Sequence, residues 1–186
     1  MSDKVEKKPL WQFGTKQVVY AAIGAALYAV ITWAFNLWQI PGAGNVGVRP
    51  SIVIPMFFGI AFGPIVGFIA GFVGNILADF LSGYGFWIWW DLGNGILGLI
   101  PGLFYPIIHN YRATASIIKG EISVVLGSAL GMGLAAISEM WVSGADMNTV
   151  IFANFLPAFL TNIVWGLILL PILMVAYAAI MQRSGR

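Results

Sequence analysis

Long apolar stretches, separated by short polar or glycine-rich breaks, dominate the chain. About 20 apolar residues are needed to cross a hydrocarbon core about 30 Å thick. Four stretches approach or exceed that length, and we interpret each as a membrane-spanning helix. They cover residues 17–38, 92–108, 119–141 and 149–181.

A further apolar tract, residues 50–81, is too long for one comfortable crossing and short for two. Gly63 and Pro64 stand near its middle. This pair is a turn signal, because proline lacks a backbone donor and glycine adopts unusual backbone angles. A turn there gives six helices with both termini on one side of the membrane, whereas one long helix gives five.

The basic residues decide between these two arrangements. With six helices, eight of the nine Lys and Arg residues lie on one side and only Arg49 lies on the other. With five helices, the split becomes four against five. Because basic residues concentrate on the cytoplasmic side, the first arrangement is favoured. The sequence therefore predicts an all-α membrane protein with six transmembrane helices and both termini cytoplasmic.

Composition agrees with a single integral membrane domain over residues 1–186. The chain is 60% hydrophobic and 9% charged, and no hydrophilic segment is long enough to fold separately. We expect a cytoplasmic N-terminal segment (1–16), a six-helix bundle (17–181) and a cytoplasmic tail (182–186), in a multi-pass protein of the cell membrane. No soluble catalytic or nucleotide-binding domain is expected.

Polar residues at membrane depth gather near the outer end of the predicted bundle. Asn75 and Asp79 are one helical turn apart and therefore share a face. Ionisable groups inside spanning helices are costly unless they face a cavity or a partner, so each is a candidate functional residue. The predicted substrate-binding residues are Asn45, Arg49, Asn75, Asp79, Tyr84, Trp87, Trp90, Asp91, Asn94, Glu139 and Asn154.

Aromatic rings accompany these polar groups, and together they predict a pocket open to the outside. Flat rings with a few hydrogen-bonding groups are the usual makeup of a small-molecule site, and a planar heteroaromatic ligand would stack on them. Simpler interpretations stay open. Tryptophan is also enriched at bilayer interfaces as an anchor, and Asp79 could merely pair with Arg49.

Enzyme motifs are nearly absent. The one histidine, His109, has no partner for metal or triad chemistry, and the chain has no cysteine. No glycine-rich phosphate loop with its Lys and Ser/Thr is present. We expect no catalytic residue, no metal, no cofactor and no nucleic-acid partner. A binding protein without a motor needs an ion gradient or a powered partner. Gradient-driven carriers usually show repeated halves with broken helices near the midplane, which fits this chain poorly.

The first predicted helix carries small residues at four-residue spacing, and these form a flat strip. Such strips let another helix approach closely within lipid, where no hydrophobic effect drives association. The strip either packs against a helix of the same chain or is a docking surface for another membrane subunit. It consists of Ala21, Ala25 and Ala29, with Ala22 and Ala26 beside them.

Residues 49–104 resemble a known family. The segment FGPIVGFIAGFVGN over 62–75, then Asp79, Tyr84-Gly85, the run WIWW at 87–90 and GILG at 95–98 carry the likeness. They resemble the substrate-binding (S) subunit of energy-coupling factor (ECF) vitamin transporters, in the riboflavin-type group. The resemblance implies that the alanine strip docks onto a transmembrane coupling subunit, which is joined to two cytoplasmic ATP-binding subunits.

The resulting hypothesis is a non-enzymatic subunit that captures a vitamin-like small molecule with high affinity from outside. It would deliver this molecule through an ATP-driven module in the lipid bilayer. Riboflavin is the first candidate ligand, and thiamine or its pyrimidine precursor, cobalamin or another heteroaromatic nutrient are the others. The alternative is a stand-alone membrane carrier or channel for a small nutrient. An intramembrane enzyme or assembly factor is a further rival, which the lack of a catalytic constellation disfavours.

Overall fold

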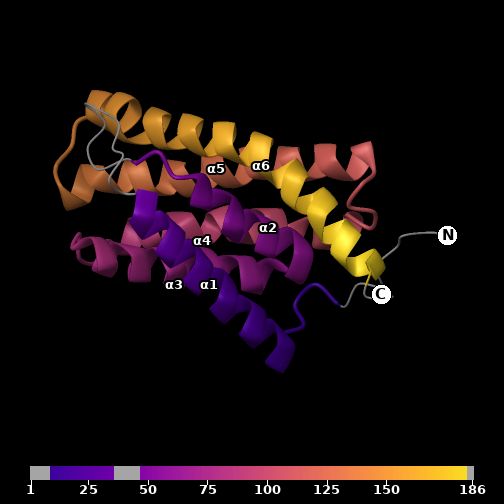
Figure 1. Ribbon diagram of the computed structural model, residues 1–186. Coiled ribbons are helices and arrows are strands. Elements are labelled where there is room, and N and C mark those ends of the chain that lie inside the picture. The colour runs from indigo at the N-terminus through magenta and orange to yellow at the C-terminus, as the bar shows by residue number, and fades with distance from the viewer. Residues whose placement is uncertain (1–8, 36–46, 184–186) are drawn as a thin grey trace.

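A computed structural model describes residues 9–35 and 47–183, and these residues form an all-helical bundle (Figure 1). Three short helical segments join or precede the longer ones: the 3-10 helices η1 (Pro50–Ile52) and η2 (Tyr105–Ile107), and the π-helix η3 (Thr149–Phe155). The α-helices are α1 (Thr15–Phe35), α2 (Val53–Phe62), α3 (Pro64–Ser82), α4 (Ile88–Leu103), α5 (Thr114–Val142) and α6 (Leu156–Arg183).

Successive helices run in opposite directions, so their ends gather at the two ends of the bundle (Figure 1). The starts of α1, α3 and α5 lie with the ends of α2, α4 and α6 at one end, on the right of the view. Helix α1 packs mainly on α3, while α4 is in contact with α2, α3 and α5. Helix α6 contacts α5 and α2.

The predicted turn at Gly63 and Pro64 is confirmed. Gly63 has a φ of 106°, a left-handed value that favours glycine, and it ends α2 and precedes α3. Its N–H donates to the Gly59 carbonyl at 2.8 Å. Pro64 then opens α3, where its missing N–H leaves no helical hydrogen bond unmade. The tract at 50–81 therefore doubles back into two helices.

Length and composition make four helical segments suitable for crossing a membrane: Thr15–Phe35, Pro64–Ser82, Thr114–Val142 and Thr149–Arg183. The segment Pro50–Phe62 is apolar but shorter. The all-helical fold with six α-helices in the described residues matches the predicted class. Six crossings with cytoplasmic termini stay a prediction.

Three helices begin earlier than the apolar pattern predicts, and α1 does so at Thr15 rather than at residue 17. Helix α4 begins at Ile88, so part of the aromatic run expected in the preceding loop is helical. The non-helical backbone of Trp87 (φ −128°, ψ 73°) marks the actual boundary. Helix α5 begins at Thr114 rather than at residue 119. At α5 the first added residues, Thr114, Ala115 and Ser116, are small or polar, so the apolar pattern does not include them in the helix.

Glycines bring the backbones of α2, α3, α4 and α5 into direct contact. A Cβ built on Gly98 of α4 would fall on the carbonyl group of Gly67 in α3. A Cβ on Gly71 would fall on the Asn94 carbonyl oxygen, and one on Gly93 would lie 2.6 Å from the Gly131 oxygen. Close approach of this kind compensates for the missing hydrophobic drive between helices in lipid. It also fixes α4 in the position from which it supplies polar side chains to the site.

Gly98→Ala is expected to lower the free energy of unfolding by about 1–3 kcal/mol, because the added methyl group must displace backbone rather than a flexible side chain. Thermal unfolding in mild detergent measures this. Gly133→Ala in α5 is the matched control, because the nearest atom to its Cβ would be Phe155 Cε2 at 4.0 Å. A Gly98→Ala protein as stable as Gly133→Ala would contradict the close α3–α4 packing.

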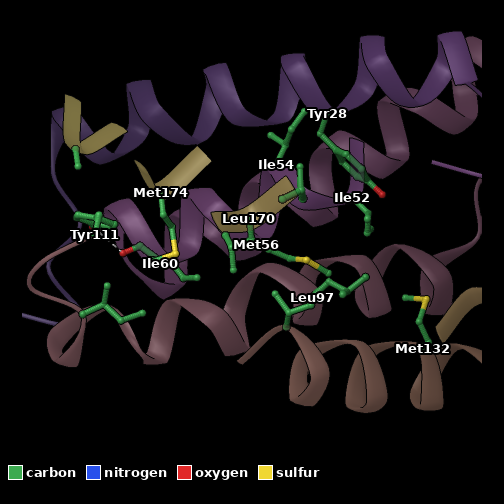
Figure 2. Close-up of a cluster of buried hydrophobic side chains, with 14 of the residues drawn as sticks. Tyr28, Ile52, Ile54, Met56, Ile60, Leu97, Tyr111, Met132, Leu170 and Met174 are labelled. Carbon is green, nitrogen blue, oxygen red and sulfur yellow. Dashed lines mark hydrogen bonds between the residues drawn. The ribbon is translucent and has the colours of Figure 1, made fainter. Parts of the chain in front are cut away.

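The apolar core lies between α2, α4, α5 and α6 (Figure 2). Met56 and Ile60 of α2 are fully buried, as is Leu97 of α4. Near the other end of the core, the Tyr111 hydroxyl donates to the Ile60 carbonyl at 3.2 Å, which satisfies this buried polar group. The core therefore fills the bundle, and the polar cluster described below lies to one side of it.

Candidate functional site

Helices α1, α3 and α4 together bury a cluster of hydrogen-bonded polar side chains near the end where α3 finishes and α4 begins. Each of its members is at most 7% exposed. We call this cluster the polar network. It consists of Tyr28, Asn75, Asp79, Asp91 and Asn94.

Asn75 is the centre of the polar network. Its Nδ2 donates to Asp79 Oδ2 and to Asp91 Oδ1, each at 2.9 Å. The first bond joins residues one turn apart on α3, as the sequence spacing predicts, and the second joins α3 to α4. The side-chain nitrogen of Asn75 therefore holds the carboxyl groups of Asp79 and Asp91, which come from different helices. The two are close enough for one small chemical group to contact both.

Tyr28 joins α1 to the network, although it was not among the site residues predicted from the sequence. Its hydroxyl lies 2.8 Å from Asn94 Oδ1 and 3.4 Å from Asn75 Oδ1, both acceptors for its one proton. Asn94 in turn donates from Nδ2 to the Trp90 carbonyl at 2.9 Å. The available signal was a tyrosine hydroxyl within a strip of alanines on an apolar helix, since such a hydroxyl needs a partner when buried.

Arg49 reaches the network from the segment before η1. It is partly buried, and its Nη1 donates to Asn75 Oδ1 over 3.4 Å. Thr32 Oγ1 and Ser51 Oγ share a buried hydrogen bond of 2.7 Å, which fixes η1 against the end of α1. Neither Thr32 nor Ser51 was among the predicted substrate-binding residues. Their bond positions Arg49, because only Pro50 separates that residue from Ser51.

A second set of bonds links α4 to the end of α5. Trp90 Nε1 donates to Glu139 Oε1 at 2.8 Å, and Ser143 Oγ donates to Glu139 Oε2 at 2.7 Å. Glu139 thus lies in the same region as the polar network, connected to it through Trp90 and the Asn94 amide. Trp90 and Glu139 are both predicted site residues, and the structure brings them into direct contact.

The other predicted aromatic residues lie at the rim. Trp87 is 41% exposed, and its Nε1 donates to the Tyr84 carbonyl at 2.8 Å. Trp89 contacts Trp141 of α5 edge to face, with ring centroids 5.5 Å apart. Tyr84 and Trp87 belong to the connection between α3 and α4, and Trp89 lies in the first turn of α4, whereas every residue of the polar network is buried.

The remaining two predicted site residues are Asn45 and Asn154. Asn45 falls outside the described residues. Asn154 is half-buried on η3, and no hydrogen bond to the polar network is found for it. π-helices are rare in proteins, and those that occur are often found at functional sites. Asn154 therefore stays a candidate site residue, because it lies on such a helix.

The alanine strip of α1 divides into two faces. Ala21, Ala25 and Ala29 are buried, and the Ala25 backbone lies against Gly74 of α3. Ala22 and Ala26 are exposed. Of the two interpretations left open by the sequence, packing within the chain therefore accounts for the first three alanines. Docking of a partner on the strip stays a prediction, with Ala22 and Ala26 as the accessible residues.

Comparison with known proteins gives consistent matches. Residues 12–179 match the family model described as ECF-type riboflavin transporter, S component. A UPF0397 protein of Aliivibrio salmonicida (strain LFI1238) is 38% identical over 145 residues, covering 75% of this chain and 77% of that protein. A UPF0397 protein of Streptococcus sanguinis (strain SK36) is 31% identical over 173 residues, covering 91% of this chain and 94% of that protein. The likeness to the streptococcal protein thus extends over almost the full length of both chains.

Proposed function

Because this chain belongs to the family of ECF-type riboflavin transporter S components, we propose that it captures a small heteroaromatic micronutrient at the polar network. As an S component it is a membrane transport subunit rather than an enzyme. Beyond family membership, we propose a place where the substrate binds, a side of the membrane from which it enters, and the other subunits that complete the transporter.

The polar network is the observation that carries this proposal. Buried polar groups in an apolar bundle are costly, and ionisable groups among them are functional candidates by default. Tyr28, Asn75 and Asp91 come from three different helices, so a ligand that bonds to this group would contact α1, α3 and α4 at once. The aromatic rim around Trp87 supplies stacking surfaces for a planar ring.

The distribution of charge supports an outward-facing site. Lys16 lies in the first turn of α1, Arg183 ends α6, and Arg112 and Lys119 lie on either side of the start of α5, all at the end away from the polar network. Basic residues concentrate on the cytoplasmic side of membrane proteins. The end with the polar network then faces outside, and both termini lie in the cytoplasm of a cell-membrane protein with six crossings.

Riboflavin is the first ligand to test, because the family description names it. Its flat ring system suits the aromatic rim, and its hydroxyl and imide groups suit carboxylate and amide partners. Thiamine or its pyrimidine precursor and cobalamin are the other candidates, since each also combines a heteroaromatic ring with hydrogen-bonding groups.

Transport in this proposal requires a transmembrane coupling subunit and two cytoplasmic ATP-binding subunits, as in an ECF-type importer. The exposed alanines Ala22 and Ala26 of α1 are the proposed docking surface, because small side chains permit close helix contact. The chain contains no phosphate-binding loop of its own, so ATP must be used elsewhere.

Uptake of radiolabelled vitamins into vesicles tests the proposal against a stand-alone carrier or channel. Vesicles that hold this chain with the coupling subunit and both ATPases are expected to accumulate the vitamin only when ATP is supplied on the ATPase side. Vesicles that hold this chain alone are expected to bind the vitamin without accumulating it. Uptake by the chain alone at the same rate, with no ATP, would establish the alternative instead.

A further inference from the structure

Asp91 is buried with an unused acceptor. Its side chain is 0% exposed, and Oδ1 accepts the Asn75 hydrogen bond, whereas Oδ2 has no hydrogen-bond partner within the described part of the chain. An unpaired carboxylate oxygen in an apolar interior is costly, so such an atom marks a place where a donor is missing.

The acids around Asn75 outnumber the bases. Asp79 and Asp91 both bond the same Asn75 nitrogen, while Arg49 is the one basic side chain that the described residues bring to it. The remaining described Lys and Arg residues belong to the opposite end of the bundle. Residues 36–46 contain no Lys, Arg, Asp, Glu or His, so that segment adds no charge.

This imbalance has a physical consequence. When Asp79 and Asp91 are both ionised, their two negative charges face the single guanidinium of Arg49, and an environment of low dielectric constant solvates the remaining negative charge poorly. A bound cation removes the imbalance. A metal ion is a poor candidate, because no third Asp, Glu or His joins the pair in residues 9–35 and 47–183, and hard cations take about six oxygen ligands.

We infer that the ligand captured here carries a positively charged nitrogen with N–H donors, such as an amidinium, a protonated aminopyrimidine or an ammonium group, which Asp91 Oδ2 accepts. This inference rests on the proposed function and narrows it. Carboxylates pair with planar N–H groups in short, charge-assisted hydrogen bonds. Among the candidate vitamins, it favours the thiamine class over the uncharged flavin.

Two fragments of nearly the same shape test the charge directly. Benzamidine is a cation at neutral pH, and benzamide is its uncharged counterpart. Binding to the purified chain in detergent is measured by the ligand-induced shift of thermal unfolding and by tryptophan fluorescence. Benzamidine is expected to bind at least tenfold more tightly than benzamide. Equal affinity, tighter binding of benzamide, or binding of neither fragment would overturn the inference.

Asp91→Asn removes the charge with little change of shape, and it is expected to abolish the preference for benzamidine. Asp146→Asn is the matched control. Asp146 is exposed at the same end of the bundle, and its Oδ1 accepts a hydrogen bond from the Thr149 N–H at 2.8 Å, which lowers the pKa of Asp146 and keeps it ionised. A preference that survives in Asp91→Asn, or that is lost equally in Asp146→Asn, would also contradict the inference.

The same measurements keep this inference separate from the proposed function. Tight binding of riboflavin or another uncharged vitamin, with no preference for benzamidine, would overturn the cationic ligand and leave vitamin capture standing. Failure to bind any vitamin, charged or uncharged, would count against vitamin capture itself.

Discussion

Asn75→Ala is expected to lower the free energy of unfolding by about 3 kcal/mol, since it leaves buried carboxylates without their shared donor. Asp79 Oδ2 and Asp91 Oδ1 both lose the Asn75 Nδ2 bond, and the Arg49 and Tyr28 donors lose an acceptor. Because the Asn75–Asp91 bond joins α3 to α4, the loss acts on the packing of the bundle as well. Thermal unfolding in mild detergent measures the change.

Asn148→Ala is the control for Asn75→Ala. Asn148 is exposed at the same end of the bundle, where it precedes η3 without a side-chain capping bond. Its replacement is expected to change stability by less than about 0.5 kcal/mol. If Asn75→Ala proved as stable as Asn148→Ala, the polar network would not be the connected structure described above.

Ala26→Leu is expected to reduce ATP-driven uptake at least tenfold while leaving ligand affinity unchanged. Ala26 is exposed on α1, away from Tyr28 and the polar network, so the larger side chain meets no group that holds the ligand. It would, however, separate α1 from a helix docked on the strip. Uptake and equilibrium binding are measured on the same protein preparation.

Two further alanines on α1 serve as comparisons for Ala26→Leu. Ala34→Leu adds the same bulk at an exposed position two turns away, and normal uptake is expected. Ala25→Leu is expected to destabilise the fold, because Ala25 is buried and its backbone lies against Gly74. Normal uptake by Ala26→Leu would exclude this strip as the docking surface.

The fold was predictable where local chemistry leaves little choice. Gly63 and Pro64 form the turn that their backbone preferences require, and it divides the tract into α2 and α3. The start of α4 was not predictable from the same signals. Gly83 and Gly85 have positive φ values, as turn glycines do, but Ile88, Trp89 and Trp90 after them carry no capping residue to mark the new helix.

The acidic and amide residues of the candidate site were predictable from the sequence. Most of the contacts between them were not. Asn75 and Asp79 share a face of one helix, so helical spacing alone anticipates their bond. Tyr28 contacts residues 47 and 66 positions away, which depends on how α1 packs against α3 and α4. The division of the alanines into buried and exposed faces depends on the same packing.

Vitamin binding by the chain alone, without its partner subunits, is the decisive experiment on substrate capture at the polar network. The purified chain is titrated with riboflavin, thiamine, the thiamine pyrimidine and cobalamin, and the complex is weighed by native mass spectrometry. We expect one tightly bound vitamin molecule per chain, and we expect Asp79→Ala to lower the affinity for this vitamin at least tenfold. A chain that retains none of these compounds, or an Asp79→Ala protein that binds as the unaltered chain does, would contradict this proposal.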